Sequence, residues 1–195
     1  MSTIILIRHC ETDLAGKFCG HSDPDLNAVG QQRLDSLARE IDALGVSRIL
    51  SSDLERAART ARAISERIGV PVEIRPGLRE INFGVWEGLS WEEIEQQYHA
   101  EAQLWVSEFP ARSAPGGEAY QDFVARVEAE FRAIVSENDA VKCAVVTHRG
   151  VMRYVLTECF GFSEDEARKQ TENYGAVVVA AQSSAPRQNL SVHSM

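Results

Sequence analysis

The sequence predicts an α/β fold: a three-layer sandwich in which helices cover both faces of a mainly parallel central sheet. Two features of the chain lead to this prediction. Residues 3–7 and 143–147 are predominantly apolar runs, as expected of strands that are buried on both faces. Segments with helical periodicity separate the predicted strands, so strands and helices largely alternate, which favours a parallel sheet.

The first part of the chain contains three predicted strands and two predicted helices. The strands lie at 3–7, 47–52 and 72–74, and the helices lie at 28–44 and 52–69. Gly45 and Gly69 are expected to end the two helices. Ser52 and Glu55 have the spacing of a capping box, which predicts the start of the second helix.

The rest of the chain begins with an irregular segment, residues 76–117, that is rich in glycine and proline. Ser90 is expected to begin a short helix inside it. The elements predicted after this segment are a helix at about 118–136, a strand at 143–147, a helix at about 151–160, and strands at 176–181 and 189–192. No internal repeat is visible, so we expect one domain over residues 1–195, with a flap at about 76–117.

The size and charge of the chain exclude several classes of protein. The chain has 195 residues, a formal net charge of -9 and no long run of lysine or arginine. Binding to a nucleic-acid backbone needs a basic surface, so nucleic acid is not an expected partner. No apolar run approaches the roughly 18 residues of a membrane-spanning helix, so no membrane association is expected.

Cysteine usage and the N-terminus predict a cytoplasmic location. Cys10, Cys19, Cys143 and Cys159 do not have the regular spacing of a disulfide framework. In a chain of this length we expect them to be reduced thiols. The N-terminus runs directly into the first predicted strand, without the charged and apolar regions of a secretory signal.

Polar side chains follow three of the predicted strands at the point where each strand ends. Arg8 and His9 follow the first strand, and His148 follows the strand at 143–147. Arg56 lies one turn into the helix after the second strand. Ligands of open α/β sheets bind beyond the carboxyl ends of the strands, so these groups are expected to meet there. Two or three arginines with two histidines favour a compact dianion, and phosphate fits this description.

His9 is the candidate nucleophile of such a site. Arg8 beside it is expected to lower the pKa of His9 and so to keep the imidazole neutral. A neutral imidazole can attack phosphorus, whereas an imidazolium cannot. Phosphoryl transfer otherwise needs in-line placement and positive groups around three equatorial oxygens. Arg8, Arg56 and His148 can supply these groups without a metal ion.

Six segments of the chain carry a family resemblance. They are "LIRHCET", "GHSDPDLNAVGQQ", "SSDLERAARTA", "LREINFGVWEG", "PGGEAYQDFVARV" and "VVTHRGVMR". The first resembles the Arg-His-Gly-Glu-Thr signature of the histidine phosphatase superfamily, the phosphoglycerate-mutase-like proteins, and the others recur in that family's order. The resemblance spans almost the whole chain and implies a phosphoglycerate-mutase-like fold.

The resemblance implies a role for each residue of the site. His9 would accept the phosphoryl group and form a phosphohistidine. Arg8, Arg56 and His148 would hold that group. Glu80 would protonate the leaving oxygen, a role that suits a carboxyl group in an enclosed pocket.

The implied activity is that of a metal-independent histidine acid phosphatase-type phosphomonoesterase, with no cofactor and with a small phosphorylated metabolite as substrate. Mutases of the family are usually longer, so the short chain favours hydrolysis over mutase-type transfer. "GHSDPDL" and "PGGEAYQDFVARV" are similar to α-ribazole phosphatases, which makes α-ribazole 5'-phosphate the first candidate substrate. Two alternatives stay open: phosphoglycerate mutase-type phosphoryl transfer, and a catalytically silent phospho-ligand-binding module. The flap would cover the substrate, and the chain is compatible with a homodimer.

Three further residues and one short segment near the site match or depart from the family pattern. Thr12 matches a hydroxyl position that often contacts phosphate. Cys10 stands where the family usually has glycine, which is expected to reshape the phosphate cradle and to place a thiol beside a cation, a setting that favours thiolate. Arg149 also replaces a frequent glycine; it is either an additional substrate contact or part of the helix layer. The segment 13–16 looks shorter than usual and lacks an asparagine common there.

Three other patterns in the sequence offer different interpretations. Cys143 and Arg149 have the spacing of cysteine-dependent phosphatases, but the residues between them read as a strand, so Cys143 is expected to be a buried apolar residue. His9, Cys10, Cys19 and His21 lack the paired spacing of a zinc site. The aromatic residues of the flap either form a lid or pack as its core; they are Trp86, Trp91, Tyr98 and Trp105.

Overall fold

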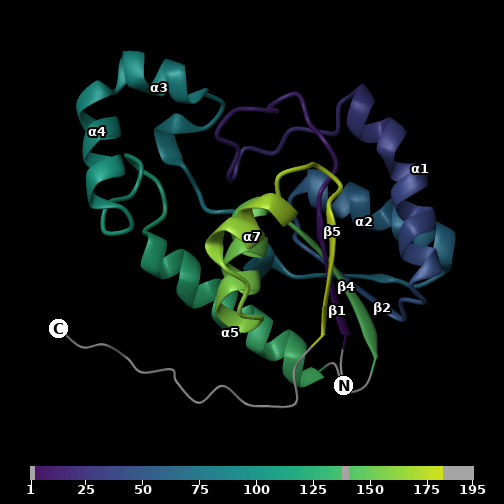
Figure 1. The fold of residues 1–195 in the computed structure, drawn as a ribbon. Coiled ribbons are helices and arrows are strands. Elements are labelled where there is room, and N and C mark those ends of the chain that lie inside the picture. Colours follow the sequence, from purple (N-terminus) through teal and green to yellow (C-terminus); the bar gives the residue numbers. More distant parts are fainter. Residues whose placement is uncertain (1–2, 138–140, 182–195) are drawn as a thin grey trace.

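The computed structural model describes residues 3–137 and 141–181, and within them the chain forms an α/β sandwich (Figure 1). The strands of the described residues form one five-stranded sheet in the order β3-β2-β4-β1-β5. Their bounds are β1 Thr3–Arg8, β2 Arg48–Ser51, β3 Val72–Ile74, β4 Lys142–Thr147 and β5 Val177–Ala181. β1 to β4 pair in parallel, and β5 runs antiparallel to β1. The mainly parallel sheet is confirmed, while the predicted strand at 189–192 lies outside the described residues.

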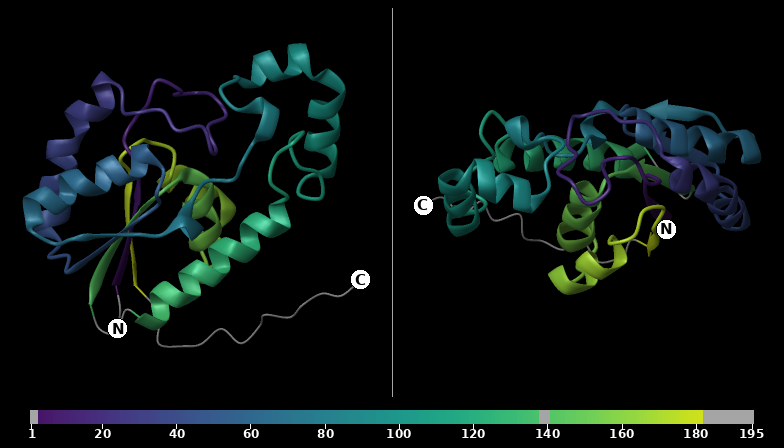
Figure 2. Two further views of the ribbon diagram at one scale, coloured as in Figure 1. Left: turned by 180° about the vertical axis from the view of Figure 1, so that it is seen from behind. Right: turned by 90° about the horizontal axis from the view of Figure 1, so that it is seen from above.

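Alternate residues of β1 face two different helix layers. Ile5 and Ile7 pack in one buried cluster with residues of α1 and α2, and Ile4 and Leu6 pack in another with residues of α5, α6 and α7. Figures 1 and 2 show the two helix layers on opposite sides of the sheet. These helices are α1 Ala28–Ala43, α2 Glu55–Ile68, α5 Tyr120–Glu137, α6 Arg149–Tyr154 and α7 Glu164–Gln170. The three predicted layers follow from this alternation.

The start of α2 differs from the predicted capping box. α2 begins at Glu55, and the side chain of its N-cap residue, Leu54, makes no capping hydrogen bond. Ser52 Oγ accepts a hydrogen bond from the Leu54 N–H at 3.3 Å and lies 2.9 Å from Nε2 of His148. The Glu55 N–H donates to Oδ1 of Asp23 at 2.7 Å, so a carboxylate from a distant loop satisfies the helix N-terminus. Ser52 is therefore available to the functional site.

Segment 76–117 contains more helix than predicted. α3 (Trp91–Gln97) begins at the expected Ser90, whose side chain forms a capping box with Glu93. α4 (His99–Glu108) follows directly and was not predicted, because its apolar residues are spread around the helix rather than gathered on one face. Figure 2 shows α3 and α4 projecting beyond one end of the sheet.

α7, which lies outside this segment, was also not predicted; it is short and has one buried residue, Ala167.

An aromatic cluster forms a third, smaller core inside this projecting segment. Trp86 is fully buried, and its ring centroid lies 5.7 Å from that of Trp105. Phe18, from the loop between β1 and α1, joins the cluster with ring centroids 4.9 Å from Phe83 and 6.1 Å from Trp86. The flap tryptophans therefore pack mainly as a local core, and the β1–α1 loop is attached to it.

The direction of the strands brings four chain segments to one edge of the sheet. β1, β2 and β4 are parallel and end there, with Arg8 paired to Thr147 in the register. β5 is antiparallel, so it begins at the same edge, where the Gly175 N–H donates to the carbonyl oxygen of His9 at 3.1 Å. The turn at 171–176 thus lies against the end of β1. Among the described residues, no helix is long and apolar enough to cross a membrane.

Candidate active site

Three of the predicted site residues, His9, Arg56 and His148, meet beyond the carboxyl edge of the sheet. His9 follows β1, His148 follows β4, and Arg56 lies in the first turn of α2. Nε of Arg56 donates to Nε2 of His9 at 3.3 Å, and the ring centroids of His9 and His148 are 5.1 Å apart. All three side chains are buried. The fold therefore gathers them from three distant parts of the chain.

The two ring nitrogens of His9 have different partners. Nδ1 lies 2.7 Å from the carbonyl oxygen of Cys10, and because a carbonyl only accepts, Nδ1 carries the proton. Nε2 consequently holds the lone pair, in agreement with the N–H that Arg56 donates to it. Burial, followed by the charge of Arg56, lowers the pKa of His9 well below its ordinary value. His9 thus presents a neutral nucleophilic nitrogen.

Arg56 is held by the loop between β1 and α1. Its Nη1 donates to the carbonyl oxygen of Ser22 at 2.7 Å. Its Nη2 donates to the carbonyl oxygens of Gly20 at 2.7 Å and Cys19 at 3.2 Å. A planar guanidinium that binds three fixed acceptors has one orientation, and here its Nε is directed at His9.

Arg8 is held by the turn that precedes β5. Its Nη1 donates to the carbonyl oxygen of Thr171 at 3.2 Å and also to that of Glu172. The central carbon of the guanidinium lies 3.8 Å from the centroid of the Tyr174 ring, which is a cation–π contact. Nε of Arg8 is buried and has no hydrogen-bond partner among the described residues. The turn therefore fixes Arg8 and leaves its buried Nε N–H as a donor for a ligand.

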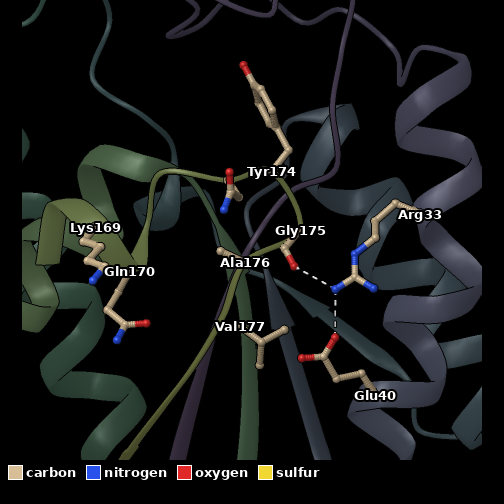
Figure 3. A pocket seen from close by; sticks show the side chains of 9 residues that line it. Arg33, Glu40, Lys169, Gln170, Tyr174, Gly175, Ala176 and Val177 are labelled. Atoms are coloured by element: carbon tan, nitrogen blue, oxygen red, sulfur yellow. Dashed lines mark hydrogen bonds and ion pairs between the residues drawn. The ribbon is translucent and has the colours of Figure 1, made fainter. Parts of the chain in front are cut away.

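The turn that carries Tyr174 is fastened to α1 (Figure 3). Arg33 of α1 donates to the carbonyl oxygen of Gly175 at 3.3 Å and to the carboxylate of Glu40 at 2.8 Å. A cavity of about 370 Å³ lies between α1, α7 and this turn, and Figure 3 shows the Tyr174 ring pointing away from Glu40. Arg33 thus ties the turn to α1 at the wall of this cavity.

His148 is oriented by Ser52. Nε2 of His148 lies 2.9 Å from Ser52 Oγ, and Nδ1 is buried without a partner among the described residues. Burial, followed by the charge of Arg56, lowers the pKa of His148 well below its ordinary value. Buried polar nitrogens that lack a partner cost free energy, so a ligand rich in acceptor oxygens would satisfy both His148 Nδ1 and Arg8 Nε.

Glu80 is positioned beside this cluster by backbone donors. Oε2 of Glu80 accepts a hydrogen bond from the Gly150 N–H at 2.8 Å, and Oε1 accepts one from the Ile81 N–H at 3.0 Å. A Cβ atom at Gly150 would overlap Oε1 of Glu80, so this approach requires glycine. Arg126 of α5 donates to the carbonyl oxygen of Glu80 at 2.8 Å. Because Gly150 is two residues after His148, the carboxyl group lies on the His148 side of the site.

Thr12 and Arg149, the remaining predicted substrate contacts, are placed very differently. Thr12 is buried, and its Oγ1 accepts a hydrogen bond from the Leu14 N–H at 3.3 Å, so it shapes the turn after β1. Arg149 is exposed at the first position of α6, and its side chain makes no hydrogen bond or ion pair with the described part of the chain.

The expectation of a reactive thiol at Cys10 is wrong. The Cys10 side chain is fully buried in the core under α1 and α2, and burial raises its pKa. Only its backbone reaches the site, through the carbonyl oxygen that binds His9. Cys143 is likewise fully buried, and burial raises its pKa to about 12, which confirms its interpretation as an apolar core residue.

The side chains weighed as zinc ligands have other partners. The Cys19 thiol donates to the carbonyl oxygen of Ser22 at 3.8 Å, and Nε2 of His21 lies 3.1 Å from the carbonyl oxygen of Glu80. Within residues 3–137 and 141–181, no group of three or more His, Cys, Asp or Glu side chains is arranged to hold a metal ion.

Comparison with known proteins agrees with this geometry. The family model of the histidine phosphatase superfamily (branch 1) matches residues 4–190. The chain belongs to this superfamily. The adenosylcobalamin/α-ribazole phosphatase of Escherichia coli is 32% identical over 159 residues, which cover 80% of this chain and 78% of that protein. Phosphoserine phosphatase 1 of Hydrogenobacter thermophilus is 29% identical over 163 residues, covering 83% and 77%. The crystal structure of the α-ribazole phosphatase from Shigella flexneri matches with a TM-score of 0.80 at 29% identity, covering 91% of this chain and 89% of that one.

Sequence reasoning misses two contributors to the site of this histidine phosphatase. Tyr174 precedes the last apolar run, and only the antiparallel direction of β5 brings it next to Arg8. A strand's direction is not visible in its own sequence, although the "NYG" before the run marks a turn. Arg126 lies in the quoted "PGGEAYQDFVARV" segment, but its contact with Glu80 depends on how α5 packs.

Proposed function

We propose that the chain is a metal-independent phosphomonoesterase that hydrolyses small phosphate esters through a phosphohistidine at His9. One observation carries the proposal: Nε2 of His9 holds a lone pair inside a buried cluster with Arg56, Arg8 and His148. Two nitrogens of that cluster, Arg8 Nε and His148 Nδ1, have no partner among the described residues. A phosphoryl group supplies acceptors for them, and its charge offsets that of the arginines.

The first step transfers the phosphoryl group to His9. Nε2 attacks phosphorus and forms the N–P bond while the bond from phosphorus to the ester oxygen breaks. The proposed acid, Glu80, gives its carboxyl proton to that oxygen, so the product leaves as an alcohol. Arg8, Arg56 and His148 stabilise the negative charge on the equatorial oxygens, which is the main demand of phosphoryl transfer.

The second step releases phosphate. A water molecule attacks phosphorus and gives one proton to the Glu80 carboxylate, the N–P bond breaks, and the electron pair returns to Nε2. Glu80 is then protonated again and the enzyme is ready for a new ester. The backbone N–H groups of Gly150 and Ile81 support this assignment, because they hold the carboxyl group in place through both steps.

The part of the substrate beyond the phosphate is proposed to contact exposed groups around the pocket. Arg149 supports this proposal, since it is exposed, has no partner among the described residues and directly follows His148. Thr12 is proposed to support the phosphate site through the turn after β1. Residues 1–195 are proposed to form one domain with 76–117 as its substrate-covering flap, because Phe18 packs into the flap core.

The first substrate to test is α-ribazole 5'-phosphate. Relatives named as α-ribazole phosphatases support this choice, while a phosphoserine phosphatase with similar identity argues for testing phosphoserine beside it. We place the protein in the cytoplasm; its four free cysteines support this location, since disulfides are rare there.

The test measures turnover of p-nitrophenyl phosphate, α-ribazole 5'-phosphate and phosphoserine by the wild-type chain and by His9→Ala. We expect turnover by the wild type, its loss in His9→Ala, and no effect of Arg39→Ala, which changes an exposed residue of α1. Acid-labile labelling with radioactive phosphate is expected in the wild type alone. Binding of inorganic phosphate without any turnover would identify a silent binding module, and isomerisation of 3-phosphoglycerate faster than its hydrolysis would identify a mutase.

A further inference from the structure

Glu87 is outside the proposed catalytic residues, yet its carboxylate accepts four backbone hydrogen bonds. Oε1 accepts from the N–H groups of His21 at 2.8 Å and Phe83 at 2.9 Å, and Oε2 accepts from those of Ser22 at 2.9 Å and Gly20 at 3.0 Å. Burial alone would raise the pKa of Glu87, but these donors outweigh it, and the pKa lies below its ordinary value. An ionised carboxylate therefore organises the loop.

The loop that Glu87 binds is also the loop that holds Arg56. Gly20 and Ser22 each donate their N–H to Glu87 and offer their carbonyl oxygen to the Arg56 guanidinium. The carbonyl oxygen of Cys19 binds the same guanidinium at 3.2 Å. The peptide groups of the loop thus lie between an anion on one side and a cation on the other. A displacement of this loop displaces Arg56.

We propose that Glu87 is a positioning residue for phosphoryl transfer: it fixes the loop at 19–22, whose carbonyl groups direct Nε of Arg56 at Nε2 of His9. This proposal rests on the proposed function, because only that function makes Arg56 important for catalysis. Glu87 acts through the loop and Arg56 rather than on the substrate. The path runs from a carboxylate through backbone hydrogen bonds to the 3.3 Å contact of Arg56 with His9.

Only a carboxylate of this length satisfies the loop. Glutamine has one acceptor oxygen and one NH2 donor, so in Glu87→Gln two of the four backbone N–H groups would face a donor. Gly20 of this loop also lies so close to Ile81 and Glu87 that a larger residue does not fit there. A Cβ atom at Gly20 would overlap the carbonyl oxygen of Ile81 and crowd Oε1 of Glu87. Gly20→Ala therefore disturbs the same contact while the Glu87 carboxylate remains.

The test compares Glu87→Gln with Glu66→Gln, which removes the same charge from an exposed residue near the end of α2, outside the 76–117 segment. We expect kcat for p-nitrophenyl phosphate to fall about tenfold to a hundredfold in Glu87→Gln, because small misplacements of catalytic groups have effects of that size. Inhibition by inorganic phosphate is expected to weaken in parallel. Glu66→Gln is expected to match the wild type in both.

A second measurement separates positioning from stability. The pKa of His9, followed by NMR titration of its imidazole, is expected to rise in Glu87→Gln, because Arg56 lowers it and would move away. Arg8 of β1, His148 after β4 and Tyr174 of the 171–176 turn also face His9, but the Glu87 loop holds none of them. A residue that only stabilises the fold would lower Tm and leave this pKa unchanged.

Each outcome decides the proposal. If Glu87→Gln folds and keeps both the wild-type kcat and the wild-type His9 pKa, Glu87 does not position Arg56, whatever its effect on Tm. If Glu87→Gln fails to fold, Gly20→Ala takes its place with the same expected results and the same refutation. A wild-type chain without turnover would refute the proposed function alone, because the His9 titration and phosphate binding still report on Glu87 in that case.

Discussion

Nε of Arg56 donates a hydrogen bond to Nε2 of His9, the atom that the proposed reaction uses as its nucleophile. The bond directs the lone pair of His9 toward the cation. A phosphoryl group that bonds to Nε2 replaces this contact, and the same N–H then lies within reach of a phosphoryl oxygen. One donor thus serves His9 before the reaction and the phosphate during it.

Arg56→Lys is expected to lower kcat for p-nitrophenyl phosphate by about a hundredfold to a thousandfold, the usual effect of losing one donor to a transition-state oxyanion. A lysine carries the charge but cannot bind the loop carbonyls and His9 together. Arg59→Lys is the matched control, since Arg59 lies three residues further along α2 and pairs with Asp25 at the surface. Retention of more than a tenth of wild-type kcat in Arg56→Lys would contradict the assigned role.

The two buried histidines predict that the protein loses stability in mild acid. The pKa values of His9 and His148 in the folded chain lie below the unfolded value of about 6.5. Below that pH the unfolded chain binds protons that the folded chain does not, so the free energy of unfolding falls as pH falls. The slope is about 1.4 kcal/mol per pH unit for each histidine until its folded pKa is reached.

Urea unfolding at several pH values between about 5 and 7.5 measures this slope. The double variant His9→Asn, His148→Gln is expected to show a flatter dependence on pH, since neither new side chain titrates. An equal slope in the wild type and in the double variant would mean that other groups cause the loss of stability.

Gly150→Ala is expected to impair protonation of the leaving group. The added methyl overlaps Oε1 of Glu80 and pushes that carboxyl group away from the Gly150 N–H. Alkyl phosphates need the proton, whereas p-nitrophenolate leaves well without it. We therefore expect kcat to fall at least tenfold more for an alkyl phosphate than for p-nitrophenyl phosphate.

The comparison with Glu80→Gln provides the control for this prediction. The two variants are expected to share the same dependence on the leaving group, and the double variant is expected to be no worse than Glu80→Gln alone. Equal losses for both substrates in Gly150→Ala would show that the methyl group disturbs something other than Glu80.

Tyr174 is expected to act on Arg8 mainly through its ring. The ring lies over Arg8 at 3.8 Å, so Tyr174→Phe keeps the cation–π contact and Tyr174→Ala removes it. We expect Tyr174→Ala to raise KM and the inhibition constant of inorganic phosphate by about threefold to thirtyfold, the effect of a contact of this kind. Tyr174→Phe is expected to match the wild type; a large loss in both variants would point to the hydroxyl group.

The parts of the fold and site that could be predicted from sequence are those set by short-range pattern. The apolar runs gave the strands, the carboxyl-edge rule placed Arg8, His9 and His148 together, and the resemblance added Glu80. The fate of Cys10 was not predictable in this way. Its side chain enters the layer under α1 and α2, and which face a residue takes just after a strand depends on the local turn.

At Ser52, tertiary contacts replace the capping box that the local sequence predicts. Its spacing from Glu55 favours a capping box, yet in the fold its hydroxyl lies 2.9 Å from His148 and Asp23 satisfies the helix terminus. The sequence near Ser52 contains neither His148 nor Asp23. Pairings between distant loops also explain why the contacts of Glu87 with Gly20, His21 and Ser22 are invisible before the fold is known.

The aromatic cluster around Trp86 gives the projecting segment an apolar interior separate from the two that flank the sheet. We therefore expect exchange of surface residues on α3 and α4 to leave the strands and the proposed catalytic residues structurally undisturbed. If the segment covers the substrate as proposed, such exchanges would change the preferred ester and not the transfer chemistry. Because its core is separate, this segment is the natural starting point for redesign of substrate preference. Phe18, which packs into that core, should be kept.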